Sequence, residues 1–495
     1  GGRGTSGLRS GGGFCVAQEE KTVKVLFAAS EAVPFAKSGG LGDVIGSLPK
    51  ELCRQGHDVR VILPLYKEIK NTRMEQLEFV GCRTIPLSWR NQYCGLFRTE
   101  YEGVIFYFID NEQYFMRDGY YGYYDDGERF AFFSKAVLES LDWMEFEPDI
   151  IHCHDWQTAL IPIYLKTLFL REGRRTNLKT LFTIHNIAYQ GRYGMEILED
   201  LLGLDQSDRS LVEMDGDVNL MKGAIVACDR LTTVSPTYAE ELHYGYYASG
   251  MESVIQRCGG KLIGILNGID TELYDPGKTA EGVPAAYSAK SLEKKALNKE
   301  ALQKSMGLEV REDLPVFSVV SRLASHKGLA LLTRIFSEMM NLPLQFVLLG
   351  AGEAQFEAFF REQAARYPGK VAAKTVFSES LAHNIYAGAD FLLMPSISEP
   401  CGLSQMISLR YGTVPVVRET GGLRDTVKPY LFDKKEGNGI TFSSVNAHDL
   451  LGAVERSLDL FRQKEDWNKV RENGMKQDFS WKKSALRYGE LYKEL

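Results

Sequence analysis

Short runs of apolar and β-branched residues alternate with helical patterns along this chain, and the alternation starts a second time near the middle. The first series of runs lies at 23–29, 59–63, 104–109, 150–153, 180–184, 231–234 and 263–266. The second series lies at 316–320, 346–349, 372–376, 391–394 and 414–417. Such alternation is typical of buried parallel strands connected by helices. The sequence therefore predicts an α/β fold with two doubly wound, parallel-sheet domains in tandem.

The length of the chain fits this division. At 495 residues it exceeds one ordinary hydrophobic core and suits two domains of roughly 200 to 250 residues each. Turn-forming residues cluster at 264–276, after the last run of the first series. We expect a first domain at 21–268, a second at 269–478 and a final amphipathic helix at 479–495. The glycine-rich opening, 1–20, has too little apolar surface to fold, so we expect a disordered leader or tag.

The composition argues against several classes of partner. The net charge of −7 gives no broad basic surface for nucleic acid or an anionic membrane. The longest apolar stretch, 159–170, falls short of the roughly 20 residues that a membrane span requires. The eight cysteines form no C-x-x-C pair. We therefore expect free thiols in a reducing compartment, with no nucleic acid and no membrane as partner.

Two strand-to-helix loops carry cations and glycines. The loop at 37–43 reads K-S-G-G-L-G-D, and a helix is predicted from about Val44. The loop at 321–328 reads S-R-L-A-S-H-K-G and precedes a helix predicted from Leu329. In open α/β sheets, ligands bind beyond the carboxyl ends of the strands, where helix amides favour anions. Both loops therefore indicate a phosphate-type ligand, although neither is a P-loop, and a plain turn with a solvated lysine is the alternative.

Polar residues also follow three other apolar runs. The sequence H-C-H-D-W places Asp155 at a strand end, and H-N places His185 and Asn186 at the next one. We expect the two histidines of H-C-H on opposite faces of their strand, which disfavours a zinc site. A core histidine bonded to backbone is the alternative for His185. Glu399 follows the run at 391–394 and precedes a proline and a glycine, which predicts a fixed turn at the ligand crevice.

Together these motifs carry a family resemblance. The ordered set K-S-G-G-L-G-D-V, H-D-W, H-N-I-A-Y-Q-G, L-N-G-I-D, S-R-L-x-x-H-K-G, E-P-C-G-L-S-Q and R-E-T-G-G-L-R-D-T-V resembles bacterial glycogen synthases and plant starch synthases. The resemblance implies the GT-B fold, in which two Rossmann-like domains face each other across a catalytic cleft and the C-terminal helix packs back on the first domain. It implies a retaining transfer of glucose from ADP-glucose to the non-reducing end of an α-1,4-glucan. It also implies no metal or other cofactor, and a cytoplasmic location in a bacterium or the plastid stroma or starch granule in a plant.

Matching the family motifs residue by residue assigns a site. The catalytic set is Glu399, His185, Asp155, Lys327 and Arg322. The set expected to bind ADP-glucose is Lys37, Gly39, Gly40, Asp43, Asn186, Arg322, Lys327, Phe377, Glu399, Cys401, Gly402, Leu403, Thr420, Gly421, Gly422 and Leu423. Within it, the resemblance gives Lys37, Arg322 and Lys327 to the diphosphate, helped by the amides of 421–423. It assigns binding of the glucose hydroxyls to Glu399, contact with glucose near the reacting carbon to His185, and stacking on adenine to Phe377.

Departures from the family pattern are few. Ser38 stands where threonine is commoner, and Ile397 and Ser398 stand where a basic and an aromatic residue are frequent. These changes concern only the fine geometry of the donor site. The second glutamate of many GT-B enzymes is replaced by Ile407, a feature that the synthase family shares.

Other functions fit the sequence less well. A nicotinamide oxidoreductase is disfavoured because neither opening loop reads G-x-G-x-x-G. A GT-B enzyme that uses UDP-glucose or another acceptor remains an alternative, as does an inactive glucan-binding paralogue. For the acceptor, we expect stacking on tyrosines of the first domain, namely Tyr114, Tyr120, Tyr121, Tyr123 and Tyr124. The sequence leaves the oligomeric state and the choice between starch and glycogen open.

Overall fold

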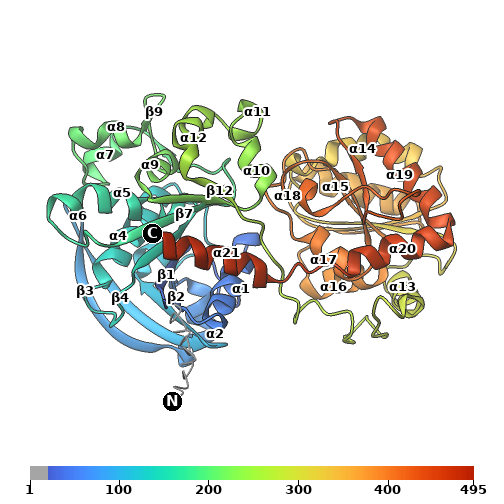
Figure 1. Cartoon of the computed structure of the whole chain (residues 1–495), viewed down its shortest axis with the longest axis horizontal. Coiled ribbons are helices and arrows are strands. Elements are labelled where there is room, and N and C mark those ends of the chain that lie inside the picture. The colour runs from blue at the N-terminus through green and yellow to red at the C-terminus, as the bar shows by residue number, and fades with distance from the viewer. Residues whose placement is uncertain (1–20) are drawn as a thin grey trace, which may run out of the picture.

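The computed structural model describes residues 21–495, which form two α/β domains lying side by side (Figure 1). The first domain contains a nine-stranded sheet and the second a six-stranded sheet. The leader expected at 1–20 lies outside the described residues. The predicted α/β class with two doubly wound sheets is confirmed.

The first sheet has the strand order β12-β11-β7-β6-β1-β2-β5-β4-β3. Seven strands pair in parallel and coincide with the seven predicted runs: β1 Lys24–Ala28, β2 Asp58–Pro64, β5 Val104–Asp110, β6 Ile150–His154, β7 Lys179–Ile184, β11 Arg230–Thr233 and β12 Leu262–Gly264. The antiparallel hairpin of β3 Glu78–Leu87 and β4 Arg90–Tyr101 at the sheet edge was missed. Its residues are largely exposed, so it lacks the continuous apolar run that identified the buried strands.

Helices cover both faces of the first sheet. The helix α1 begins at Gly40, earlier than the predicted Val44. A small sheet of β8 Arg192–Tyr193, β10 Asp217–Asn219 and β9 Glu213–Met214 lies outside the main sheet. The helices are α1 Gly40–Arg54, α2 Lys67–Arg73, α3 Glu112–Phe115, α4 Asp126–Ser140, α5 Leu160–Lys166, α6 Leu168–Arg171, α7 Ile197–Asp200, α8 Arg209–Val212, α9 Leu220–Ala227, α10 Pro236–Glu241, α11 Gly245–Ala248 and α12 Glu252–Cys258.

The second sheet is fully parallel, with the order β15-β14-β13-β16-β17-β18. Its strands are β13 Val316–Val320, β14 Gln345–Leu349, β15 Val371–Lys374, β16 Phe391–Met394, β17 Val414–Arg418 and β18 Ile440–Phe442, of which only the short β18 was not predicted. The helices of this domain are α13 Lys295–Ser305, α14 Leu329–Met339, α15 Ala354–Arg366, α16 Glu379–Gly388, α17 Ser404–Arg410, α18 Gly421–Thr426, α19 Ala447–Arg462 and α20 Lys464–Met475.

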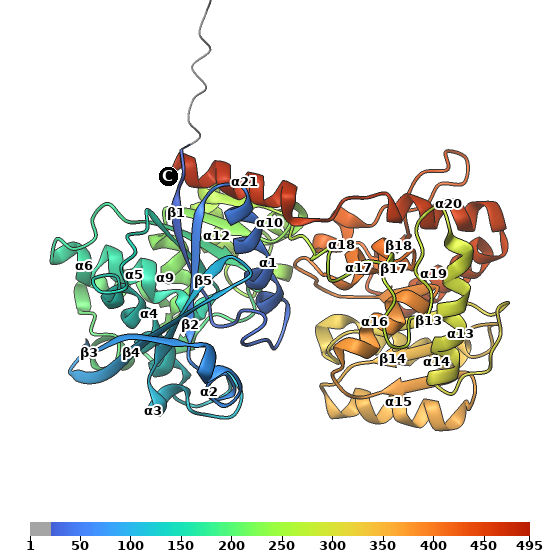
Figure 2. The ribbon, with the colours of Figure 1, turned by 90° about the horizontal axis from the view of Figure 1, so that it is seen from below.

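The last helix, α21 Trp481–Glu494, leaves the second domain and lies along the first, beside α1 (Figures 1 and 2). Its start is tied to the chain that ends the first domain. The Ile269 amide donates to the Phe479 carbonyl at 2.8 Å, and the Ser484 hydroxyl donates to the Leu266 carbonyl at 2.5 Å. Since Trp481 and Tyr492 are buried in the core of the first domain, α21 is a structural part of that domain.

The strand orders fix where a ligand crevice belongs. In the first sheet the order reverses at β1, which lies between β2 and β6. In the second sheet it reverses at β13, which lies between β14 and β16. Crevices form beyond the carboxyl ends of the strands at such reversals. A ligand site is therefore expected at the loops that follow β1, β6, β13 and β16.

Candidate active site

An ion pair marks the reversal point of the second sheet. Lys327 follows β13, Glu399 follows β16, and the lysine Nζ lies 2.9 and 2.8 Å from the two carboxylate oxygens. The Ser396 hydroxyl donates to Glu399 Oε2 at 2.9 Å. Burial raises the pKa of Glu399, but the charge and hydrogen bonds of Lys327 outweigh it, so that the pKa lies below its ordinary value. Glu399 is therefore a buried, permanently charged group.

Glycines let the loops around this ion pair pack backbone against backbone. Gly421 has a φ of 47°, and a Cβ there would lie 1.8 Å from the Glu399 carbonyl oxygen. Gly328 has a φ of 73°, and a Cβ there would lie 1.9 Å from the Pro395 carbonyl oxygen. A Cβ on Gly422 would lie 2.0 Å from the Cys401 carbonyl oxygen. A side chain at any of these positions would displace the loop that holds Glu399.

Arg418 shapes the same loop, and the sequence analysis missed it. This buried guanidinium donates from Nε to the Ser396 carbonyl at 2.8 Å and from Nη2 to the Ile397 carbonyl at 2.7 Å. A third bond runs from Nη1 to the Ser443 carbonyl at 2.7 Å. The available signal was its place at the end of β17, immediately before the E-T-G-G motif.

The amides of 421–423, which were expected to bind the diphosphate, donate to protein acceptors in this structure. The Gly421 amide donates to Glu241 Oε1 at 2.9 Å, and the Thr420 hydroxyl donates to Glu241 Oε2 at 2.8 Å. The Gly422 amide donates to the Glu399 carbonyl at 3.1 Å, and the Leu423 amide to the Thr420 carbonyl at 3.0 Å. In this structure these contacts hold the Glu399 loop, and the phosphate role of the three amides stays a prediction.

Lys37 reaches from the first domain to the second. Its Nζ lies 3.0 Å from Asp43 Oδ1 and 3.0 Å from Glu379 Oε1, and 6.0 Å from the centre of the Phe377 ring. The Phe377 side chain is 75% exposed. Arg322 is also exposed, and its guanidinium makes no hydrogen bond or ion pair within residues 21–495. Both Phe377 and Arg322 are thus accessible to a ligand at the domain boundary.

The amides of the glycine-rich loop 37–43 were also expected to bind an anion. In the structure they donate to a carboxylate of the protein itself. The carboxylate of the buried Glu31, which follows β1, accepts the Ser38 amide, the Ser38 hydroxyl at 2.9 Å and the Gly39 amide at 3.3 Å. The Tyr121 hydroxyl donates to the same carboxylate at 2.5 Å. Glu31 therefore fixes the loop that carries Lys37. The loop meets the second domain at Gly40, where a Cβ would lie 3.8 Å from Leu403.

Asp155 and His185 adjoin one another at the ends of β6 and β7. Asp155 Oδ1 accepts the His185 amide at 2.7 Å, and Asp155 has the uncommon φ of 59° for a non-glycine residue. Burial raises the pKa of Asp155 to about 7 and lowers that of His185 to about 3. The neighbouring Asn186 side chain accepts the Ala188 amide at 3.0 Å and thereby shapes the loop.

The two histidines of H-C-H do not point to opposite faces of β6, so that expectation was wrong. The His152 and His154 rings stack with centroids 4.2 Å apart. Side chains two residues apart on a strand share a face, which is the physical reason. No group of three or more His, Cys, Asp or Glu side chains that could hold a metal ion was found in the described part of the chain.

The Glu399 loop is pressed against the first domain. The Ser235 hydroxyl, at the start of α10, donates to the Pro400 carbonyl at 2.6 Å. Cys401 is buried in a hydrophobic cluster that contains residues of both domains, and Gly402, with a φ of 75°, leads into Leu403 and α17. The two halves of the site therefore meet at 399–403.

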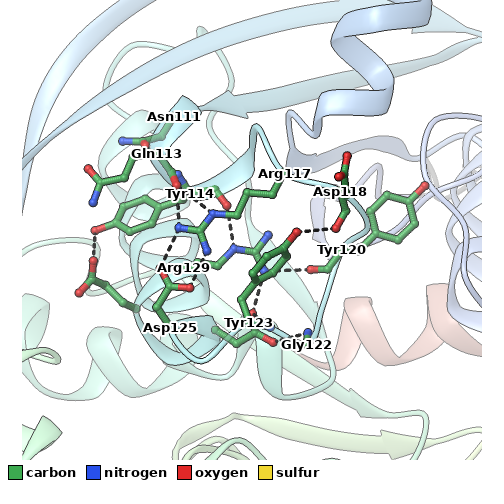
Figure 3. Close-up of polar contacts among 12 residues, drawn as sticks. Asn111, Gln113, Tyr114, Arg117, Asp118, Tyr120, Gly122, Tyr123, Asp125 and Arg129 are labelled. Carbon is green, nitrogen blue, oxygen red and sulfur yellow. Dashed lines mark hydrogen bonds and ion pairs between the residues drawn. The ribbon is translucent and has the colours of Figure 1, made fainter.

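The tyrosines of 114–124 are less available for an acceptor than expected. Tyr114, Tyr120 and Tyr123 lie among polar contacts that surround Arg129 (Figure 3). Tyr114 is fully buried and donates to Glu128 Oε2 at 2.6 Å, so it cannot stack on a sugar. The buried Arg129 donates to the Tyr114 carbonyl at 2.7 Å and the Tyr120 carbonyl at 3.0 Å, which fixes the loop between α3 and α4. Only Tyr124, at 98% exposed, lies open to solvent.

Two α/β domains that present facing cation, carboxylate and histidine groups at their strand ends define a glycosyltransferase of the GT-B class. Two family models match: the starch synthase catalytic domain over residues 24–257 and the group 1 glycosyl transferases over residues 303–477. The chain belongs to the starch and glycogen synthase family of glucosyltransferases. No helix within residues 21–495 has the length and apolar character to span a membrane.

Similar proteins agree with this placement. The chain is 50% identical to the glycogen synthase of Geobacillus thermodenitrificans over 96% of its own length and 98% of that protein. It is 50% identical to the glycogen synthase of Desulforamulus reducens over 96% and 99% of the two chains. The catalytic domain of starch synthase IV from Arabidopsis thaliana, bound to ADP and acarbose, superimposes with a TM-score of 0.88 at 35% identity, covering 96% of this chain and 99% of that one.

Proposed function

We propose that this glucosyltransferase moves glucose from ADP-glucose to the non-reducing end of an α-1,4-glucan and retains the α configuration. The observation that carries the proposal is the buried Lys327–Glu399 ion pair at the reversal point of the second sheet. It offers a cation for a phosphate and a carboxylate for sugar hydroxyls within one site. The glycogen synthase relatives, and the starch synthase IV structure with its ADP and acarbose, support this assignment.

The chemistry requires stabilisation of a departing diphosphate. The bond between the anomeric carbon and the ADP oxygen breaks, and the bond from that carbon to the acceptor 4-oxygen forms on the same face of the sugar. Negative charge therefore grows on the phosphate while the glucose becomes oxocarbenium-like. Lys327 and Arg322 from the second domain, with Lys37 from the first, supply positive charge at the phosphate. Glu399 supplies negative charge beside the glucose.

The proton of the incoming 4-hydroxyl passes to the leaving phosphate in this proposal. Glu399 is a weak base because Lys327 holds its pKa below the ordinary value. His185 is also a weak base, since burial lowers its pKa to about 3. Asp155 is bound to the His185 amide and supports that loop. A front-face reaction, in which the phosphate oxygen itself accepts the proton, agrees with the environments of Glu399 and His185.

The test is a comparison of donors with one acceptor. The protein is incubated with ADP-glucose or UDP-glucose and a malto-oligosaccharide, and nucleotide release and chain length are measured together. We expect ADP release matched by oligosaccharides lengthened one glucose at a time, with α-amylase-sensitive linkages. Release of ADP without elongation, or no release with either donor, would contradict the proposal.

Three expectations accompany this function. No metal or other cofactor takes part, since lysine and arginine side chains meet the phosphate charge. The partners are ADP-glucose and an α-1,4-glucan or malto-oligosaccharide. The location is the cytoplasm in a bacterium, or the plastid stroma or starch granule in a plant.

A further inference from the structure

A chain of buried histidines runs from the C-terminal helix to the candidate active site. The Tyr492 hydroxyl of α21 lies 2.7 Å from His152 Nδ1, and the Thr183 hydroxyl lies 2.6 Å from His152 Nε2. The His152 ring stacks on that of His154, and His154 Nδ1 lies 2.8 Å from His185 Nε2. The proposed function uses only the last of these rings, so the others need a separate explanation.

Each of these histidines is neutral. Burial lowers the pKa of His152 and His154 well below the ordinary value, and it lowers the pKa of His185 to about 3. A neutral imidazole has one N–H donor and one acceptor nitrogen. Of His154 Nδ1 and His185 Nε2, one must therefore donate and the other accept. The direction of that single hydrogen bond decides the tautomer of both rings.

The surroundings of His154 decide the direction. Its second nitrogen, Nε2, is buried and has no hydrogen-bond partner. If His185 donated, the proton of His154 would sit on Nε2 as an unpaired buried N–H. If His154 donates, Nε2 is only an unpaired acceptor. Unpaired buried N–H groups are the rarer of the two in proteins. The favoured arrangement has the proton of His154 on Nδ1 and the proton of His185 on its own Nδ1.

We propose that His154 is a positioning residue that holds the half-buried His185 in the Nδ1–H tautomer, ready to donate to the sugar, and that Tyr492 of α21 supports it through His152. This proposal rests on the proposed function for the role of His185. Within residues 21–495, His185 Nδ1 makes no other hydrogen bond, so its proton is available to an oxygen of the transferred glucose.

The packing explains why a helix from the far end of the chain takes part. Phe27 of β1 lies against both rings, with centroids 4.5 Å from His152 and 5.2 Å from His154. Tyr488 of α21 lies 5.4 Å from His152 on another side. The stack is thus enclosed between β1 and α21. In this proposal the docking of α21 affects the tautomer of His185, because Tyr488 and Tyr492 contact His152 and His152 stacks on His154.

The test reads the tautomer directly. In protein labelled with ¹⁵N-histidine, long-range ¹H–¹⁵N correlation spectra distinguish Nδ1–H from Nε2–H rings, and the chain has eight histidines to resolve. The His185 signals are assigned by their loss in His185→Gln. We expect Nδ1–H at His185 in the unaltered protein without substrate. An Nε2–H ring would overturn the proposal whatever the enzyme's activity, and so separates it from failure of the proposed function.

Variants of His154 add a kinetic measurement. His154→Phe keeps a ring in the stack but removes the donor, so we expect His185 to lose the pure Nδ1–H state and kcat to fall about 10- to 100-fold, with the donor KM within about threefold. His154→Asn places an N–H the same number of bonds from the backbone as Nδ1 of histidine. It should restore most of kcat and most of the Nδ1–H state of His185. The exposed His448→Asn is the control and should change neither. A His154→Phe protein with unchanged kcat and unchanged His185 tautomer would show the proposal wrong.

The Tyr492→Phe variant tests the support from α21. It removes one hydroxyl and keeps the packing, so a smaller fall in kcat, about two- to tenfold, is expected with partial loss of the Nδ1–H signal of His185. An identical His185 spectrum in Tyr492→Phe would remove α21 from the proposal.

Discussion

Lys327 Nζ lies within 2.9 Å of both carboxylate oxygens of Glu399, so one cation neutralises the whole carboxylate. A buried pair of this kind costs desolvation at both groups and is not by itself a source of stability. Its two members nevertheless suit different parts of a nucleotide sugar. In the proposed reaction Lys327 faces the phosphate and Glu399 faces the glucose.

The first prediction separates the two members. Glu399→Gln keeps the shape and removes the charge that is needed as glucose becomes positive, so we expect kcat to fall about 100-fold or more while the ADP-glucose KM changes less than about tenfold. Lys327→Ala should lower kcat and also raise the ADP-glucose KM, because its ammonium binds phosphate charge that is already present in the ground state. Steady-state kinetics with varied ADP-glucose checks this, with the exposed Glu362→Gln as control. Near-normal kcat in Glu399→Gln would remove that residue from the catalytic set.

The second prediction concerns the glycine that touches the Glu399 loop. Gly421→Ala places a methyl group 1.8 Å from the Glu399 carbonyl oxygen at a φ of 47°, so the loop must move. A shift of about 1 Å can cost on the order of 100-fold in rate. We expect kcat to fall at least tenfold and Tm to drop. The matched control is Gly452→Ala in α19, where nothing lies within 4 Å and a small gain in Tm is expected. Equal activity of the two variants would contradict the loop-packing argument.

The strand pattern predicts where the candidate site residues lie in the fold better than it predicts their hydrogen-bond partners. Asp155, His185, Lys327 and Glu399 all follow apolar runs, and in the structure each of them lies in a segment that follows a strand of a parallel sheet. The same rule assigned the amides of the Gly39 loop to an anion, and the family resemblance assigned the amides of 421–423 to the diphosphate. In the structure the Gly421 amide bonds to Glu241, and the Gly422 and Leu423 amides bond to backbone carbonyls. The Ser38 and Gly39 amides bond to Glu31, which precedes them by 7 and 8 residues.

The groups that hold the site were harder to foresee. Glu31 and Arg418 act through hydrogen bonds to backbone atoms of other segments, and such contacts depend on how the elements pack. The histidine stack was misjudged because the face of a strand side chain was assigned wrongly, although the period of two was sufficient to place it. The exposed hairpin β3–β4 has no apolar run to reveal it.

The third prediction is that ADP-glucose is preferred to UDP-glucose. The Phe377 ring is exposed beside Lys37 and offers a stacking surface for adenine, and stacking of a base on an aromatic ring contributes about 1–3 kcal/mol. Phe377→Ala should therefore raise the ADP-glucose KM about fivefold or more with little change in kcat. Phe432→Ala, another exposed ring of the second domain, is the control. A UDP-glucose rate at or above that of ADP-glucose in the unaltered protein would refute the preference.

The fourth prediction is independence of divalent metal. Phosphate charge is expected to be met by Lys37, Arg322 and Lys327, and carboxylates that could hold a hard cation are instead paired with lysine at Glu399 and Asp43. We expect excess EDTA to change the initial rate by less than about twofold. The measurement is ADP release before and after chelation, with magnesium or manganese added back. A large loss that either ion restores would show that a metal takes part.

The fifth prediction uses the raised pKa of Asp155. Burial raises this pKa from an ordinary value of about 3.8 to about 7. A carboxyl whose folded pKa exceeds its unfolded pKa favours the folded state fully below the unfolded pKa, and this contribution is lost as the pH rises through the folded pKa. The loss therefore develops between about pH 4 and pH 7 and stays constant above that range.

Asp155→Asn removes the titration and keeps an acceptor for the His185 amide. The Tm of Asp155→Asn minus the Tm of the unaltered protein should therefore increase as the pH rises from 4 to 7, and then stay constant. A gain of about 2–4 °C in that difference corresponds to roughly 1 kcal/mol for a domain of this size. Asparagine also tolerates the φ of 59° at this position better than most residues. Thermal unfolding of both proteins from pH 4 to pH 9 measures the difference, in which the titration of all other groups largely cancels. A Tm difference that does not depend on pH would mean that Asp155 ionises normally in the folded protein.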